Sequence, residues 1–317
     1  MLARGLWALL VLAILIAAGI GYEQVERRRD RARLPQVGRS VDIGGRSLNI
    51  YCSGEGGPTV VLESDALTPG FGWVAVQREL ATFTRACWYD RAGYGWSDPA
   101  PAPHPSTASA HDLHALLKAA GVAPPYVLAG AGFGAFNVRV YCGLYPDDVA
   151  GLVLIDALHE DQWSEERGGM SRVPFGLGYP PDVVLRAMSA VGLMRLAAPG
   201  NRRELDSDGL TPAESATLES LAREPGMRAA FLAEQAFSSG PREAHAAGGL
   251  GDRPLIVLTS ELVRTSERAV EGERQAARLE LQERLARLST RGRQAMRKDS
   301  GSVIAAVREV VRASHAR

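Results

Sequence analysis

The chain has 317 residues, of which 46% are hydrophobic and 23% are charged, so it can bury a large core and is neither disordered nor fibrous. Its 36 Lys and Arg residues balance its 36 Asp and Glu residues, which leaves no net field to attract nucleic acid. We therefore expect no nucleic-acid partner. The three cysteines, Cys52, Cys87 and Cys142, lack the spacing of a metal site, and we expect neither a metal nor another cofactor.

Residues 5–22 form an uncharged and largely apolar segment. A helix of this length, rising about 1.5 Å per residue, crosses most of a hydrocarbon layer about 30 Å thick. The apolar run is longer than the usual core of a cleaved signal peptide, which favours a retained signal anchor, a single transmembrane helix in the lipid bilayer. We expect residues 1–36 to be this membrane anchor followed by a basic connector.

Positive charge is unequal on the two sides of the predicted span. Arg4 precedes it, whereas five arginines follow it: Arg27, Arg28, Arg29, Arg31 and Arg33. By the positive-inside rule this bias would hold the rest of the chain in the cytoplasm.

Short strand patterns follow the connector. Residues 41–53 predict two strands around the Gly44-Gly45 turn, a hairpin signal. Continuous apolar runs recur at residues 59–62, 86–89, 126–129, 151–155 and 255–258. Such runs are typical of strands that are covered by helices on both faces of a sheet.

Helical patterns lie between most of these strands, for example at residues 111–120 and 303–311. The alternation predicts an α/β fold with a mainly parallel sheet. It stops between residues 157 and 253, where the helical stretches 183–196 and 213–222 indicate an inserted helical cap. The Arg- and Glu-rich stretch 264–287 predicts a solvated amphipathic helix.

Four segments together resemble the α/β-hydrolase superfamily, in particular its lipase-like and esterase-like members with a cap domain. They are the loop at residues 89–98, the strand and turn at residues 125–135, and the strands at residues 151–156 and 254–259. The resemblance runs from about residue 37 to the end of the chain. It implies an α/β-hydrolase core at residues 37–157 and 251–317, with the cap at residues 158–250.

The position of the nucleophile is occupied by glycine. Hydrolases of this kind carry Gly-x-Ser-x-Gly on a sharp turn between strand and helix, and this chain carries Gly130-Ala131-Gly132-Phe133-Gly134. Gly132 has no side chain, so it cannot attack a carbonyl carbon. The fold is expected to survive because glycine tolerates the strained angles of this turn.

The general base is missing as well. The resemblance places a histidine after the last strand, where this chain has Ser302, and the loop before the final helix looks shortened. None of the six histidines takes that place: His104, His111, His114, His159, His245 and His315. His159 is expected nearest to the pocket. Glu261 or Asp156 remains as a candidate acid, and either is equally suited to capping or pairing.

The oxyanion hole is expected to be defective. The backbone N–H of Phe133 should still be one donor, but the loop that should supply the other contains Asp65. Its charge would lie where a negative charge must be stabilised. The sequence therefore predicts a membrane-anchored pseudohydrolase that binds a small apolar ligand or a partner protein at the membrane.

Two alternatives stay open. One is an active esterase-type or lipase-type hydrolase with a rearranged site. The other is a dinucleotide-binding protein, because Gly130-x-Gly132-x-x-Ala135 follows a strand, opens a helix and matches that fingerprint, with Asp156 at the end of the next strand. A fingerprint of this kind usually opens its domain, however, and here about ninety residues precede it.

The strand order implied by the resemblance would place Cys52 and Cys87 on neighbouring strands. A disulfide between them would indicate an oxidising compartment, in disagreement with the arginine bias. Two buried free thiols are the alternative, and we favour it slightly because cysteine is among the most buried residue types.

Overall fold

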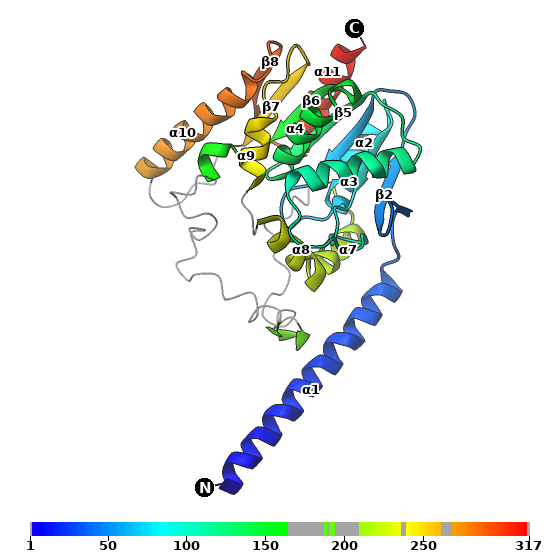
Figure 1. Ribbon diagram of the computed structural model, residues 1–317, viewed down its shortest axis with the longest axis vertical. Coiled ribbons are helices and arrows are strands. Elements are labelled where there is room, and N and C mark those ends of the chain that lie inside the picture. The colour runs from blue at the N-terminus through cyan, green and yellow to red at the C-terminus, as the bar shows by residue number, and fades with distance from the viewer. Residues whose placement is uncertain are drawn as a thin grey trace.

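The computed structural model describes residues 2–163, 187–188, 190–193, 209–235, 239–260 and 268–315. Most of the predicted helical stretch 183–196, and the candidate acid Glu261, lie outside these residues. Figure 1 shows a layered body of helices around a sheet, from which one long helix extends.

The long helix is α1, Leu2–Arg33, and it includes the predicted connector as well as the apolar segment. The connector continues the helix, because Arg and Glu are strong helix formers and Arg29 pairs with Glu26 one turn away. Among the described residues, one stretch is long and apolar enough to cross a membrane, Leu9–Asp30, with a mean hydropathy of 1.7. Its apolar side chains are exposed, Leu9 by 67%.

The body is built on an 8-stranded sheet with the order β1-β2-β4-β3-β5-β6-β7-β8. β1 and β2 form the predicted hairpin, β2 pairs antiparallel with β4, and the other pairs are parallel. The strands are β1 (Arg39–Asp42), β2 (Ser47–Ser53), β3 (Thr59–Glu63), β4 (Ala86–Tyr89), β5 (Tyr126–Ala131), β6 (Val149–Ile155), β7 (Leu255–Ser260) and β8 (Gly292–Arg297). The fold class predicted from the sequence is confirmed.

Alternate residues of the central strands enter two separate cores. In β3, Val60 and Leu62 join one core, whereas Val61 joins the other. Because side chains of a strand alternate between faces, a continuous apolar run needs helices on both sides.

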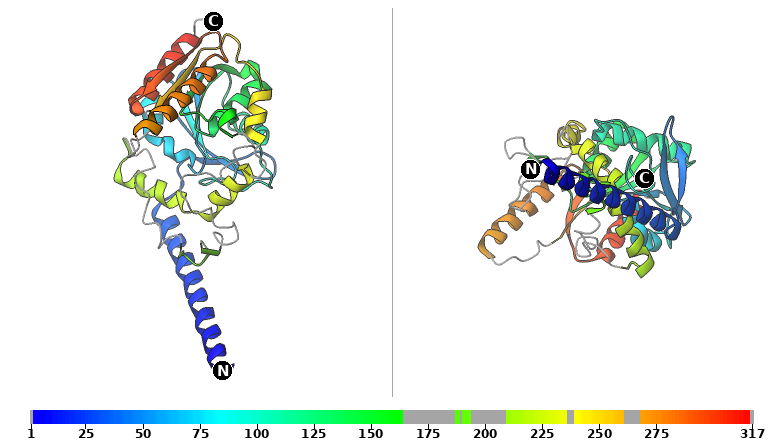
Figure 2. Two further views of the ribbon diagram at one scale, coloured as in Figure 1. Left: turned by 90° about the vertical axis from the view of Figure 1, so that its left-hand side faces the viewer. Right: turned by 90° about the horizontal axis from the view of Figure 1, so that it is seen from below.

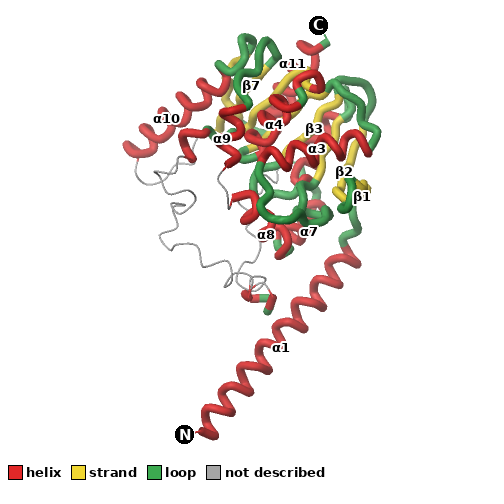
Figure 3. Tube along the Cα trace, viewed as in Figure 1, coloured by secondary structure: helices red, strands yellow, loops and turns green. Residues whose placement is uncertain are grey.

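Helices cover both faces of the sheet, as Figure 3 shows. One core includes residues of α3 (Ser106–Ala119), α4 (Gly134–Leu144), α9 (Ser239–Ala246) and α10 (Arg268–Ala286). The other includes residues of α2 (Val74–Leu80) and α11 (Ser300–Ser314).

The described part of the inserted segment is helical. It contains η3 (Glu160–Trp163), α7 (Pro212–Ala222), α8 (Pro225–Gln235) and α9. α7 begins with a capping box between Thr211 and Glu214. Two views show α7 and α8 at the end of the body from which α1 extends (Figures 1 and 2).

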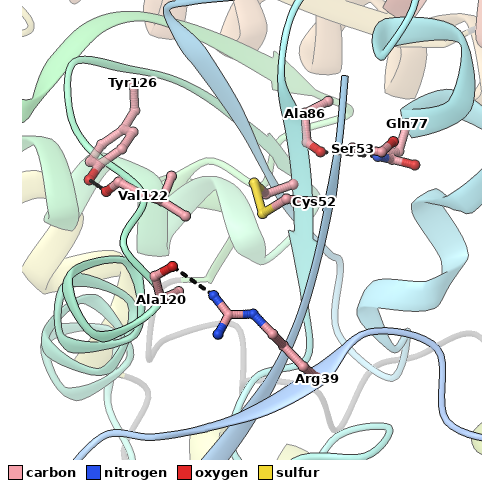
Figure 4. The surroundings of a disulfide bond; sticks show 9 residues. Arg39, Cys52, Ser53, Gln77, Ala86, Ala120, Val122 and Tyr126 are labelled. Atoms are coloured by element: carbon pink, nitrogen blue, oxygen red, sulfur yellow. Dashed lines mark hydrogen bonds between the residues drawn. A yellow bond between two sulfur atoms is a disulfide. The ribbon is translucent and has the colours of Figure 1, made fainter. Parts of the chain in front are cut away.

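Cys52 and Cys87 form a disulfide between β2 and β4, and Figure 4 shows its surroundings. The two residues are register partners of the antiparallel pair, and their Cα atoms lie 4.1 Å apart. The expectation of free thiols here is therefore wrong: both residues are buried or partly buried, as expected, but their pairing brings the sulfur atoms together. Cys142 is a buried free cysteine.

Candidate functional site

A cavity of about 250 Å³ lies where several parallel strands end. Asp65 follows β3, Gly132 follows β5, Asp156 follows β6 and Arg297 ends β8, and all four line the cavity. Apolar side chains form much of the remaining wall, including Trp73, Val76 and Leu218. The carboxyl edge of a parallel sheet is the usual place for a ligand, so this cavity is the candidate site.

The turn after β5 keeps the shape of a nucleophile elbow. Gly132 has φ +49°, the left-handed region that glycine enters without cost. Its N–H donates to the carbonyl of Ile155 at 3.0 Å, and its carbonyl accepts the N–H of Leu158 at 3.2 Å. These bonds hold the elbow against the end of β6, although no side chain projects from Gly132.

The Asp65 carboxylate lies where the oxyanion hole is expected. Its Oδ1 accepts the backbone N–H of Phe133 at 2.7 Å and that of Ala66 at 2.7 Å. Two N–H donors thus converge on one point, whereas the sequence predicts only that of Phe133. The protein's own carboxylate fills that point, as the expected position of the Asp65 charge suggested.

Asp65 also fills the space that a nucleophile would need. A Cβ atom added to Gly132 would lie 2.0 Å from Asp65 Oδ1 and 2.3 Å from Oδ2. Glycine at position 132 and aspartate at position 65 are therefore sterically matched. Desolvation raises the pKa of Asp65, and its bonds to the two N–H groups oppose this effect.

No histidine lines the cavity in the part of the chain that the structure describes. Ser302 does not line it either. Its N–H and its hydroxyl both donate to Asp299 Oδ1, at 2.8 and 2.9 Å, so Ser302 belongs to the N-terminal cap of α11. Ser300 and Val303 are the residues of α11 that reach the cavity, and neither can act as a base near neutral pH.

Asp156 is saturated by donors. It accepts the N–H and the hydroxyl of Ser260 at 2.6 and 2.7 Å, Arg278 Nη2 at 2.7 Å and Arg297 Nη1 at 2.9 Å. Its φ of +48° is unusual for a residue other than glycine. Asp156 thus joins β6 to β7, α10 and β8 as a structural anchor for the edge of the cavity.

This geometry does not support the dinucleotide alternative. A pyrophosphate at the N-terminus of α4 would meet the Asp65 carboxylate, which already takes the N–H of Phe133. The ribose would need Asp156, which already accepts four hydrogen bonds. The strand after which the glycines occur is also the fifth of the sheet, not the first.

A buried ionic network supports the Asp65 loop from behind. Arg91 Nη1 donates to Glu63 Oε1 at 2.8 Å and to the carbonyl of Ser64 at 2.7 Å, while its Nε donates to Glu234 Oε1 of α8 at 2.6 Å. Tyr94 donates to the second oxygen of Glu234 at 2.7 Å. Arg91 thereby connects the core, the loop after β3 and the cap.

The other two predicted pocket residues differ in their roles. Phe133 contributes its N–H, while its ring is buried and packs edge-on against Phe136. The expectation that His159 lines the pocket is wrong. It is buried beside η3, where its Nδ1 accepts the N–H of Asp161 at 3.1 Å, and burial lowers its pKa.

Sequence reasoning missed Arg297, Arg278 and the N–H of Ala66. Arg297 ends β8, whose sequence Gly-Arg-Gln-Ala-Met-Arg carries no apolar run and so gave no strand signal. The pairing of Arg297 with Asp156 spans 141 residues of sequence and depends on the order of the sheet.

Comparisons with known proteins agree with this fold. A family model described as alpha/beta hydrolase fold matches residues 55–176. This match and the order of the sheet agree: the chain has the α/β-hydrolase fold. The matched residues include β3, the elbow with Gly132 at its centre, and β6.

Curated relatives match parts of the chain. An AB hydrolase superfamily protein of Gibberella zeae is 30% identical over 112 residues, which are 34% of this chain and 35% of that protein. An uncharacterized vacuolar membrane protein of Saccharomyces cerevisiae is 32% identical over 108 residues, 33% of this chain and 17% of that protein. The chain spans less than half the length of the curated relatives that it matches.

Solved structures match nearly the whole chain at low identity. A thermophilic esterase from Thermogutta terrifontis covers 88% of this chain and 100% of its own, with TM-score 0.52 and 19% identity. An alpha/beta hydrolase from Sphaerobacter thermophilus covers 86% of this chain and 99% of its own, with TM-score 0.56 and 20% identity. These likenesses show the fold.

Proposed function

We propose that this chain is a membrane-anchored pseudohydrolase whose cleft binds a small, largely apolar ligand without hydrolysing it. One observation carries the proposal: the Asp65 carboxylate accepts hydrogen bonds from the N–H groups of Phe133 and Ala66. An acyl-transfer intermediate needs those same two donors for its own oxyanion. In addition, Gly132 has no side chain, so no nucleophile projects from the elbow.

Ligand binding is favoured over a purely structural role because the cleft is open. A volume of about 250 Å³ remains beside Gly132 and Asp65. Its apolar wall, with Trp73 and Leu218, suits an aliphatic or aromatic body.

The test of lost hydrolysis uses the full chain in non-ionic detergent. We expect no labelling by a serine-reactive fluorophosphonate probe and no turnover of p-nitrophenyl butyrate above the rate in buffer. Stoichiometric labelling would favour the active-hydrolase alternative. In that event the variants Ser64→Ala and Ser300→Ala would show which cavity serine reacts, since both line the cavity.

We further propose that α1 is a single-pass anchor and that the body lies on the oxidising side of the membrane. The Cys52–Cys87 disulfide supports this side, because such bonds persist in oxidising compartments. The arginines after the apolar segment favour the opposite side. We give the disulfide more weight, because the charge rule is a statistical bias whereas a covalent bond needs an oxidant.

A further inference from the structure

The cleft of this protein presents a carboxylate at the place where an active hydrolase presents N–H donors. In a working hydrolase of this fold, an oxyanion hole presents two N–H groups, which attract negative oxygen. Here both N–H groups are satisfied by Asp65 Oδ1, and the cavity meets the carboxylate in their place. Asp65 is exposed, and it lines the cavity.

The other charges around the cavity are compensated. Asp156 is paired with Arg278 and Arg297, through contacts of 2.7 and 2.9 Å. Arg91, behind the Asp65 loop, is paired with both Glu63 and Glu234.

Asp65 differs from these paired groups. Among the described residues, no arginine or lysine side chain forms an ion pair with its carboxylate. Arg91 approaches only the main-chain carbonyl of Asp65, at 3.2 Å. Asp65 therefore contributes a carboxylate without an ion-pair partner, among the described residues, to a cavity whose wall is partly apolar and partly polar.

We propose that the ligand of this cleft carries a primary ammonium group on a short apolar body, and that Asp65 binds the ammonium. This inference rests on the proposed ligand-binding role. An ammonium supplies a positive charge and further N–H donors to the Asp65 carboxylate, which otherwise accepts two neutral backbone N–H groups. Trp73 in the wall adds an aromatic surface, to which cations are attracted. Carboxylates, the acid products of ester hydrolysis, would be repelled.

The experiment compares butylammonium with butyrate, which have similar apolar bodies and opposite charges. Each is titrated into the full chain in non-ionic detergent at constant ionic strength, by calorimetry and by the midpoint of thermal unfolding. We expect saturable binding and a rise in the midpoint with butylammonium, and neither with butyrate. Equal responses to both, or none to butylammonium, would overturn the proposal.

Asp65→Asn is the decisive variant. Its side-chain oxygen can still accept the N–H groups of Phe133 and Ala66, so the loop keeps its shape without the charge. We expect butylammonium affinity to fall by about tenfold or more, the usual effect of losing a charged hydrogen-bond partner. Unchanged affinity in a variant whose circular dichroism matches the natural chain would contradict the role of Asp65.

A matched control is Asp42→Asn. Asp42 Oδ1 also accepts two backbone N–H groups, from Gly44 at 2.8 Å and Gly45 at 3.3 Å, in the turn between β1 and β2 and away from the cavity. Its affinity for butylammonium should equal that of the natural chain. Failure of this proposal is distinct from failure of the pseudohydrolase proposal, because fluorophosphonate labelling reports on a nucleophile and not on the bound charge.

Discussion

At the scale of single residues, Gly132 and Asp65 form a matched pair. Glycine gives the elbow its left-handed φ of +49°, and its missing side chain leaves room for the Asp65 carboxylate. Each residue alone would impair hydrolysis. Together they leave the elbow without a nucleophile and place the Asp65 carboxylate, hydrogen-bonded to two N–H groups, where an active hydrolase has an empty oxyanion hole.

A serine placed at position 132 should therefore lower stability and still not give esterase activity. In Gly132→Ser the new Cβ would overlap Asp65 and the backbone would be strained, so we expect a loss of about 1–3 kcal/mol in the free energy of unfolding. We also expect no esterase activity, because no histidine lines the cavity among the described residues. Urea unfolding and p-nitrophenyl butyrate turnover measure both.

The double variant Asp65→Gly/Gly132→Ser separates the two effects. Removing the carboxylate should relieve the overlap and recover part of the stability, while turnover stays at the rate in buffer. Measurable turnover by either variant would show that another group in the cleft acts as the base.

A second residue-scale prediction concerns Asp90, which is buried in the loop after β4. Its carboxylate accepts the N–H of Gly70 at 2.7 Å, that of Trp96 at 3.1 Å and Asn49 Nδ2 at 3.0 Å. Desolvation nevertheless raises the pKa of Asp90 from 3.8 to about 6. The folded state thus holds this proton more tightly than the unfolded state.

The free energy of unfolding should therefore fall as pH rises from about 4 to about 6. At 1.36 kcal/mol per pH unit, the contribution of this group is about 3 kcal/mol, present below pH 4 and lost above pH 6. Urea unfolding across this range measures it in the natural chain and in Asp90→Asn. The difference between the two curves should change with pH in this window. Parallel curves would mean that Asp90 does not titrate there.

At the scale of elements, two of the contacts that join the cap to the core are of very different kinds. Arg91 reaches Glu234 of α8 in a buried network, and its side chain is 3% exposed. Arg78 of α2 pairs with Glu214 of α7 at the surface, with its side chain 48% exposed. The desolvated contact should dominate, because water screens the other.

Arg91→Met should lower the free energy of unfolding by about 3–5 kcal/mol, since it leaves Glu63 and Glu234 buried without their partner. Amide hydrogen exchange in α8 should accelerate as well. Arg78→Met is the control, with an expected loss of less than about 1 kcal/mol. Similar losses in the two variants would contradict this ranking.

Elements also show what sequence could and could not predict. The strands β3, β5, β6 and β7 were predictable because both faces are buried, which leaves continuous apolar runs. β8 was not, because its mostly polar residues are only partly buried at the edge of the sheet. The charge of Asp65 near the hole was predicted, but its bonds to Phe133 and Ala66 depend on two loops separated by 68 residues.

At the scale of the whole molecule, the cap and α1 lie at the same end of the body (Figures 1 and 2). An added Cβ at Gly19 of α1 would lie 2.6 Å from the carbonyl oxygen of Val191, so this part of the inserted segment contacts the anchor. If α1 spans a bilayer as we propose, the cap is the part of the body closest to the membrane.

The proposed side of the membrane predicts the state of the thiols in cells. Cells lysed under denaturing conditions with an alkylating reagent should yield a chain with one labelled cysteine, Cys142, because Cys52 and Cys87 are joined. Prior reduction should expose all three. Labelling of all three without reductant would place the body in a reducing compartment.

The central claim is that a carboxylate of the protein itself occupies the oxyanion hole. The most direct measurement is a crystal structure of the cleft that resolves the Asp65 side chain and its two donors. We expect Asp65 Oδ1 to lie about 2.7 Å from the backbone nitrogen of Phe133 and at the same distance from that of Ala66. A carboxylate turned away, with both N–H groups open to solvent or to a bound ligand, would contradict the account.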